Sequence, residues 1–467
     1  MMLRITRIKI AIPLLSLSFL SIEAQKLNKN DKITLTNLEA HVHYLADDKL
    51  EGRRTGTAGE KAASDYIISA LSKAGAQPKG DNNGWLQAFV IKEGREISPD
   101  TYFSANDKPL VLYHEFFPLT ISAIGQVTGS PAIALQESGV PWFLDLRELL
   151  EAGSGSPHFN LPAAIRNKAA AFAKKGATAL IVYNSSKIPD NLAFDPQEEN
   201  PVAAAIPVLY ITAAAKRKYL RDESASVDIK IKVGFEDRQR TGHNVVAYLD
   251  NGAPATVIIG AHYDHLGHGE DSNTLYKGTG PVTYNGADDN ASGVAGMIEL
   301  ARLLAASKLK NNNYLFIAFS GKELSLSGSW NFVNRPGADL AKVNYMINLD
   351  MIGRLNDTTH ALTIGGYQSA AWEPICNAVH DKKLFSFHFD GVDTWSGDHS
   401  SFYRQRIPVL FISTGITADY HTPGDKEDKL NYPGEVAVLK FVYEVIEGAN
   451  DKGKLPFTGT KIATEIK

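Results

Sequence analysis

Histidine, carboxylate and lysine side chains follow several separate apolar runs in this sequence. The run "ATVIIGAHYDHLG" ends at His262 and Asp264, and "YLFIAFS" is followed by Lys322 and Glu323. Similar runs and motifs contain Asp288 and Asp289 in "NGADDNASG", Asp350 in "VNYMINLDMIG", and His421 in "DYHTPGD". Two zinc ions that share one carboxylate bind imidazole and carboxylate ligands and leave a position open for water. The two histidines, together with three of the carboxylates, therefore predict a site for two zinc ions.

Each of these residues alone is weak evidence for a metal site, because a single histidine or aspartate in a loop usually caps a turn or points into solvent. Their occurrence after separate strands is what favours a shared site. Asp264 lies two residues beyond His262 and is placed to hold the second ring nitrogen of that histidine. His265 and His268 lie past the end of the strand and are interpreted as loop residues. The same ligands suit cobalt or manganese, so the sequence leaves the metal open.

The elements that carry these residues alternate between apolar strands and amphipathic helices. The near-continuous apolar runs are typical of parallel strands that are covered on both faces. In the segment after Asp289, a helical period of 3.6 fits the apolar residues Val294, Met297, Ile298, Ala301 and Leu304. Alternation of this kind predicts an α/β fold with a mostly parallel central sheet and flanking helices, in which ligands bind beyond the carboxyl ends of the strands.

The amino-terminal segment has the layout of a secretory signal peptide. Arg4, Arg7 and Lys9 precede an apolar run at residues 10–22, and Ala24 follows it. The run is shorter than the roughly 20 residues that a membrane span needs, which disfavours an uncleaved anchor. We therefore expect residues 1–24 to be removed, and the mature protein to be secreted or periplasmic without stable membrane insertion.

The mature chain divides by composition into four parts. Residues 25–99 are expected to begin the domain that contains the predicted metal site, 100–236 to form a β-rich insertion, 237–455 to form the main part of that domain, and 456–467 to form a tail. A net charge of −4 with 44% hydrophobic residues is typical of a globular protein, and nothing in it indicates nucleic-acid binding. The single cysteine, Cys376, excludes an internal disulfide. Oligomeric state is left open.

The order of the motifs resembles that of the M28 peptidases, a family of zinc-dependent exopeptidases that includes bacterial leucine-type aminopeptidases. The resemblance rests on "LADDKLEGRRTGTAGEKAASDYI", "GHNVVAYLDNGAP", "GAHYDHLG", "NGADDNASG", "FSGKELSLSGS", "NLDMIGR", "SGDHSSF" and "DYHTPGD". It implies a phosphorylase/hydrolase-like zinc exopeptidase fold, an exported protein, and a protease-associated (PA) domain at 100–236. The implied partner is a peptide substrate, from which an aminopeptidase releases amino-terminal residues by attack of a zinc-bound hydroxide.

The resemblance also implies roles for individual residues. Asp289 becomes the bridging carboxylate and its neighbour Asp288 a variable position. The ligands of the two zinc ions are then His262 and Asp350 for one, and Glu323 and His421 for the other. Tyr420 is placed to donate to the oxygen that becomes negative in the reaction. The motif "SGDHSSF", with Asp398, His399 and Phe402, is a candidate wall of the specificity pocket, and ordinary loop packing is an equal alternative.

Lys322 departs from the family pattern, in which a glutamate at this position acts as the general base. Zinc-activated water could react without that base, a lysine of depressed pKa could replace it, or the pocket could have become a binding site. A cation here also disfavours a substrate α-ammonium and could instead attract a substrate carboxylate. The competing functions are a catalytically impaired binding protein and glutaminyl cyclisation with one zinc ion, and the complete ligand set disfavours the second.

Overall fold

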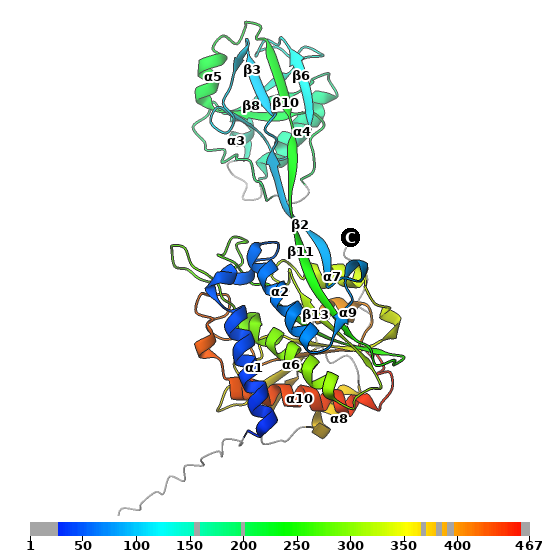
Figure 1. The fold of residues 1–467 in the computed structure, drawn as a ribbon. Helices are drawn as coiled ribbons and strands as arrows, with labels where there is room; N and C mark the ends of the chain where they lie inside the picture. Colours follow the sequence, from blue (N-terminus) through cyan, green and yellow to red (C-terminus); the bar gives the residue numbers. More distant parts are fainter. Residues whose placement is uncertain are drawn as a thin grey trace, which may run out of the picture. The chain divides into compact units, whose positions relative to one another are not determined.

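The computed structural model describes residues 27–153, 159–197, 201–365, 370–379, 385–389 and 397–458. The chain forms two compact units, one from Met1–Gln87 with His243–Lys467 and the other from Ala88–Gly242 (Figure 1). The second unit begins before residue 100 and ends after residue 236, so it includes the whole predicted insertion. The predicted signal peptide, residues 1–24, and residues 459–467 of the predicted tail lie outside the described residues.

The first unit is built around a mixed sheet with the strand order β1-β11-β13-β12-β14-β17-β15-β16, and β2 pairs with β11 off this path. These strands are β1 (Gln77–Pro78), β2 (Leu86–Ile97), β11 (Phe235–Leu249), β12 (Thr256–His262), β13 (Asn313–Phe319), β14 (Val343–Leu349), β15 (Ala361–Gly365), β16 (Ser386–Phe389) and β17 (Val409–Ser413). Both β2 and β11 include residues that belong to the second unit. The central strands β13, β12, β14 and β17 are parallel to one another. β11 and β15 run antiparallel to β13 and β17. The predicted α/β class is therefore confirmed, with antiparallel pairing toward both edges.

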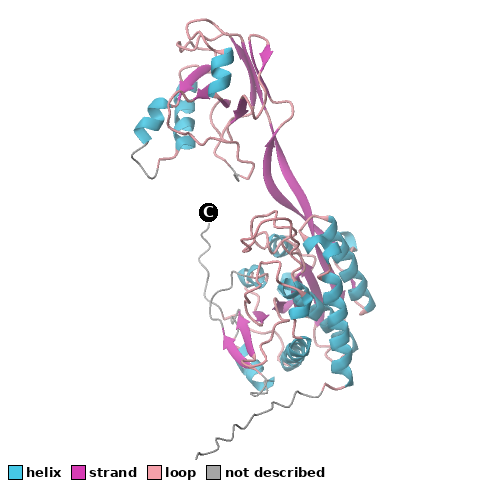
Figure 2. Ribbon diagram, turned by 90° about the vertical axis from the view of Figure 1, so that its left-hand side faces the viewer, coloured by secondary structure: helices cyan, strands magenta, loops and turns pink. Residues whose placement is uncertain are grey.

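Helices cover both faces of this sheet (Figures 1 and 2). Side chains of one face, including Val257 and Ile259 of β12, pack with α1 (Lys29–Leu45), α2 (Ala58–Lys73), α6 (Gly293–Ala306), α8 (Trp372–Val379) and α10 (Tyr432–Asn450). Ile258 points to the other face and packs with α7 (Ser327–Asn334) and α9 (His399–Arg404). Successive residues of a strand point to opposite faces, so every residue of β12 is buried.

The connections between these elements contain short helical turns, and side chains cap the amino-terminal ends of several helices. The 3₁₀ turns are η1 (Asp48–Arg53), η2 (Asp81–Asn83), η4 (Leu340–Lys342) and η5 (Glu427–Lys429), and η3 (Ala287–Ser292) is a π-type turn. Asn28 caps α1 in a capping box with Asp31, and Thr57 caps α2. Such caps satisfy main-chain N–H groups that the first helical turn leaves free.

Within its described residues, the second unit contains two further sheets and three helices. One sheet has the order β4-β3-β10-β6 and the other β5-β9-β8-β7. The strands and helices are β3 (Tyr102–Ala105), β4 (Lys108–Pro109), β5 (Phe116–Pro118), β6 (Gly125–Gly129), β7 (Trp142–Asp145), α3 (Arg147–Gly153), α4 (Leu161–Ala173), β8 (Leu180–Tyr183), β9 (Val208–Ile211), α5 (Ala213–Tyr219) and β10 (Ile229–Val233). Its designation as a PA domain stays a prediction. Within the described ranges of the chain, no helix has the length and apolar character needed to cross a membrane.

Candidate metal centre

The predicted ligands lie at the carboxyl ends of the central parallel strands. β12 ends at His262, and Glu323 and Asp350 follow β13 and β14. His421 lies in the loop after β17, and Asp289 belongs to η3, before α6. The carboxyl ends of parallel strands share one edge of the sheet, so these side chains converge where open α/β sheets bind ligands.

Asp289 lies between the two histidines of the predicted set. Its Oδ1 is 3.1 Å from His262 Nε2, and its Oδ2 is 3.4 Å from His421 Nε2. Each carboxylate oxygen therefore faces a different imidazole. This arrangement creates two candidate metal positions. We call them the His262 position and the His421 position.

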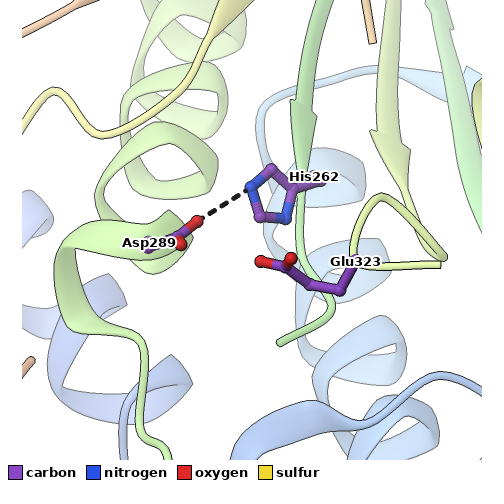
Figure 3. A group of neighbouring side chains, drawn as sticks. All are labelled: His262, Asp289 and Glu323. Carbon is purple, nitrogen blue, oxygen red and sulfur yellow. Dashed lines mark ion pairs between the residues drawn. The ribbon is translucent and has the colours of Figure 1, made fainter. Parts of the chain in front are cut away.

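Each position has one further carboxylate. His262 Nε2 is 3.4 Å from Asp350 Oδ1, and His421 Nε2 is 3.2 Å from Glu323 Oε2. Ligands at 2.0–2.1 Å from a tetrahedral zinc ion are separated by about 3.3 Å, so the observed separations match. Figure 3 shows that the side chains of His262, Asp289 and Glu323 converge on one space. Ligand atoms of these three residues lie within 4.8 Å of one another.

We call the side chains of His262, Asp289, Glu323, Asp350 and His421 the cluster, and their nitrogen and oxygen atoms suit a metal ion. Among the described residues, the buried atoms His262 Nε2, His421 Nε2 and Asp289 Oδ2 have no hydrogen-bond partner. Buried polar atoms normally have a hydrogen-bond partner. Unpartnered nitrogen and oxygen atoms that face one another therefore indicate a site for a cation. Burial lowers the pKa of His421, but Asp289 and Glu323 outweigh this effect and raise that pKa to about 10. The carboxylates thus favour a cation, either a proton or a metal ion, at the imidazole.

Asp264 organises the loop that carries Glu323. Its Oδ1 accepts the main-chain N–H of Lys322 and its Oδ2 that of Glu323, each at 3.2 Å. The predicted contact with the ring of His262 takes a different form. His262 Nδ1 hydrogen-bonds the main-chain oxygen of Asp264 at 3.1 Å, while the carboxylate lies 3.6 Å away. The carboxylate instead accepts two main-chain N–H groups in the loop that follows β13.

Two residues that the sequence did not single out hold the segment around Asp289. Asp425 accepts the main-chain N–H groups of Asp288 and Asp289, both at 2.9 Å from its nearer oxygen. The buried guanidinium of Arg53 donates to the main-chain oxygens of Leu45, Tyr263, Asn285 and Gly286. Asp425 lies in the motif "DYHTPGD" and Arg53 in the motif "LEGRRTGT", and these motifs were the only signal of either residue in the sequence. The groups that the two residues bind are distant in sequence.

Lys322 lies inside the cluster rather than beside it. Its Nζ is 3.4 Å from Asp289 Oδ1 and 3.2 Å from Glu323 Oε1, so it contacts one carboxylate of each position. Burial lowers the pKa of Lys322, but Asp289, Glu323 and Asp350 together hold it above its ordinary value. Without metal, this environment favours the ammonium over the neutral amine.

The remaining predicted site residues border the cluster. The ring of Tyr420 stacks on that of His421 at 4.0 Å between centroids, and Lys322 Nζ is 5.9 Å from the Tyr420 centroid. Burial raises the pKa of Tyr420 to about 12, so its hydroxyl remains a donor at neutral pH. Asp398 and His399 are buried, with side-chain atoms that lack partners among the described residues.

His265 is the histidine that sequence reasoning set aside. Its side chain is buried against the cluster, and its Nδ1 is 3.5 Å from Glu323 Oε1. By contrast, His268 is exposed, as expected for a loop residue. Both histidines follow the end of β12 within six residues, and this placement in the sequence does not show which of them is buried.

Part of the first unit matches a known protein family. Residues 244–446 match the model of peptidase family M28. This stretch is a peptidase family M28 domain. The predicted resemblance is thereby confirmed, and the ligand set of the M28 domain stays a prediction that the cluster geometry supports.

The chain is similar to curated proteins and to solved structures. The chain is 25% identical over 330 residues to "probable leucine aminopeptidase 2" of Aspergillus oryzae, covering 63% of this chain and 62% of that protein. It is 26% identical over 292 residues to "Aminopeptidase YwaD" of Bacillus subtilis, covering 58% of each. In both cases it spans less than two thirds of the relative. A solved structure of BSAP, a zinc aminopeptidase from Bacillus subtilis, aligns with a TM-score of 0.49 and 19% identity over 91% of this chain and 96% of that chain.

Proposed function

We propose that this protein is a zinc-dependent exopeptidase that removes amino-terminal residues from peptides, with two zinc ions at the cluster. The observation that carries the proposal is the position of Asp289 between His262 and His421. Each histidine has a second carboxylate neighbour, which completes two sets of ligands of the kind that catalytic zinc uses. The relatives named as aminopeptidases support the same activity.

Zinc, when bound, supplies Lewis acidity for a peptide carbonyl and lowers the pKa of a water molecule. The chain's own contribution is to position the reacting groups. Tyr420 keeps its proton, and its hydroxyl can donate a hydrogen bond to the carbonyl oxygen as negative charge develops there. Asp264 fixes the main chain of Lys322 and Glu323, and Asp425 fixes that of Asp289. These contacts keep the ligands in place before a substrate binds.

A second candidate function is favoured by one specific contact. The ammonium of Lys322 lies against Asp289 and Glu323, where it places a positive charge instead of a proton acceptor. This charge repels a substrate α-ammonium and attracts a carboxylate. The alternative is therefore an M28 domain with impaired hydrolysis that binds peptides or prefers acidic or carboxyl-terminal groups.

A peptide digest distinguishes the two functions. Zinc-loaded protein is incubated with a mixed peptide library, with and without chelator, and the products are read by mass spectrometry. Loss of single amino-terminal residues that stops with chelator and in His421→Ala supports the exopeptidase. His268→Ala, a change at the exposed histidine, is the matched control. Intact peptides in the presence of two bound zinc ions would contradict hydrolysis and support the binding function.

Export is part of the same proposal. The basic residues and apolar run at the amino terminus support a secreted or periplasmic protein. Sequencing the amino terminus of the protein from secreted and periplasmic fractions tests this. A mature chain that begins after Ala24 is the expected result, and an intact amino terminus in the cell interior would contradict it.

A further inference from the structure

His265 is buried without the partners that a buried histidine normally has. It lies three residues beyond the end of β12, and its side chain is 0% exposed. Among the described residues, neither Nδ1 nor Nε2 has a hydrogen-bond partner. Buried polar groups normally have a hydrogen-bond partner, so a ring in this state points to a ligand that is bound in the functional protein.

The ring nitrogen Nδ1 faces the His421 position. It is 3.5 Å from Glu323 Oε1 and 3.9 Å from Asp289 Oδ2. The ring also packs edge-to-face on that of His421, with 5.9 Å between the centroids and 79° between the planes. All three ligands of the His421 position are therefore neighbours of His265.

Four separations among these side chains lie near the edge length of a tetrahedral zinc site, with His421 facing Glu323 Oε2 and His265 facing Glu323 Oε1. The separations are 3.2 Å and 3.4 Å from His421 Nε2 to Glu323 Oε2 and Asp289 Oδ2, and 3.5 Å and 3.9 Å from His265 Nδ1 to Glu323 Oε1 and Asp289 Oδ2. A tetrahedron of ligands around zinc has edges of about 3.3 Å. We propose that His265 is the fourth protein ligand of the His421 position and binds the metal through Nδ1. The inference rests on the proposed function only in that it requires zinc to bind there.

The main chain holds His265 in this orientation. Its N–H donates to the main-chain oxygen of Arg53 at 3.3 Å. Gly286 lies over the ring with φ of +56°, and a Cβ on Gly286 would lie 2.6 Å from His265 Cγ. Only glycine permits both this backbone conformation and this close approach. The ring is thus confined on the side that faces Gly286.

A fourth ligand makes the two metal positions unequal. Structural zinc sites have four protein ligands, whereas catalytic sites have three and an open position. The His421 position then has four, namely His265, Asp289, Glu323 and His421. The His262 position has three protein ligands, His262, Asp289 and Asp350. The Lys322 ammonium is 3.4 Å from Asp289 Oδ1, the oxygen that faces His262. We therefore expect tight zinc binding at the His421 position, and weaker binding with an open coordination position at the other.

The first test measures zinc affinity by chelator competition. His265→Ala is compared with His268→Ala, which removes an exposed imidazole from the same loop. Removing a residue that hydrogen-bonds a metal ligand lowers metal affinity about 10- to 100-fold. Loss of a direct ligand is therefore expected to weaken zinc binding at the tighter site, the His421 position, at least about 10-fold. His268→Ala should retain wild-type affinity. Equal affinities in the two variants would overturn the proposal.

The second test reports on ligation directly and does not depend on activity. In His265→Cys, a thiolate at 2.3 Å from the metal can replace Nδ1 at 2.0–2.1 Å, because Nδ1 is the ring nitrogen nearer the main chain. With Co²⁺ in place of zinc, a thiolate ligand produces a near-ultraviolet charge-transfer band. The band is expected in His265→Cys and not in His268→Cys. If neither variant shows it while both bind Co²⁺, residue 265 is not a ligand.

The two proposals fail in different ways. A wild-type protein that binds no zinc contradicts the zinc exopeptidase and the fourth ligand together. A wild-type protein that binds two zinc ions and cleaves peptides, with zinc binding at the tighter site unchanged in His265→Ala, contradicts the fourth ligand alone.

Discussion

Lys322 Nζ lies 3.4 Å from Asp289 Oδ1, the oxygen that also faces His262. The carboxylate that two metal positions would share is thus already in contact with a cation of the chain. Asp289, Glu323 and Asp350 carry three negative charges and Lys322 one positive charge, so a single zinc ion neutralises the cluster. With a glutamate in place of Lys322, the cluster would carry four negative charges, which balance two zinc ions.

Lys322→Glu is expected to increase peptide hydrolysis. The carboxylate would supply a general base, which contributes about 10²- to 10⁴-fold, and would remove the ammonium from Asp289. Lys322→Gln removes the charge without adding a base and is the matched control. The measurement is kcat/KM for an aminoacyl anilide at saturating zinc. Equal rates in the two variants would show that proton transfer at residue 322 does not limit the reaction.

Much of the cluster could be predicted because its residues follow buried strands. The apolar runs that became β12, β13 and β14 end next to His262, Lys322 and Asp350, and strand ends converge in a parallel sheet. The antiparallel strands β11 and β15 gave no such signal, because a short apolar run does not reveal the direction of its neighbour.

His265 could not be recognised as a neighbour of the ligands from the sequence. Its position depends on a hydrogen bond to Arg53 and on the conformation of Gly286, and both residues are distant along the chain. The same holds for Asp425, whose carboxylate reaches the main chain of Asp289. Contacts of this kind follow from tertiary packing and leave no periodic pattern.

Zinc is expected to stabilise the folded protein. A ligand that binds only the folded state at 100 times its Kd adds about 2.7 kcal/mol, which raises the Tm of the unit that binds it by several degrees. Thermal unfolding of chelator-treated protein, with and without added zinc, measures the shift. Mg²⁺ prefers oxygen ligands and retained waters, so it should produce a smaller shift. Equal shifts would argue against the histidines as ligands.

Arg53→Met is expected to destabilise the first unit more than Arg54→Met. Arg53 is buried and donates to four main-chain oxygens, three of which belong to Tyr263, Asn285 and Gly286 next to the metal cluster. Each oxygen left without a partner costs about 1–3 kcal/mol, so the total loss is expected to reach about 3 kcal/mol or more. Arg54 pairs with Asp271 in a partly exposed contact, so its loss should be smaller. Urea unfolding of both variants provides the comparison, and equal midpoints would contradict the role of Arg53.

Asp398 is expected to make the stability of the metal-free protein depend on pH. Burial raises the pKa of its carboxyl to about 7 from an ordinary value of 3.8. Between about pH 4 and pH 7 the folded state therefore holds a proton that the unfolded state has released. The contribution of Asp398 to stability is full below this window and falls as pH rises through it, by up to about 1.4 kcal/mol per pH unit.

Asp398→Asn removes this titration with little change in shape. The free energy of unfolding of the variant, minus that of the wild type, is expected to grow from pH 5 to pH 8, because only the wild type loses the contribution of a protonated carboxyl. Urea unfolding of the two chelator-treated proteins at both values measures the difference. A constant difference would mean that the carboxyl of Asp398 is already ionised at pH 5 in the folded protein, and that a polar partner or water compensates for its burial.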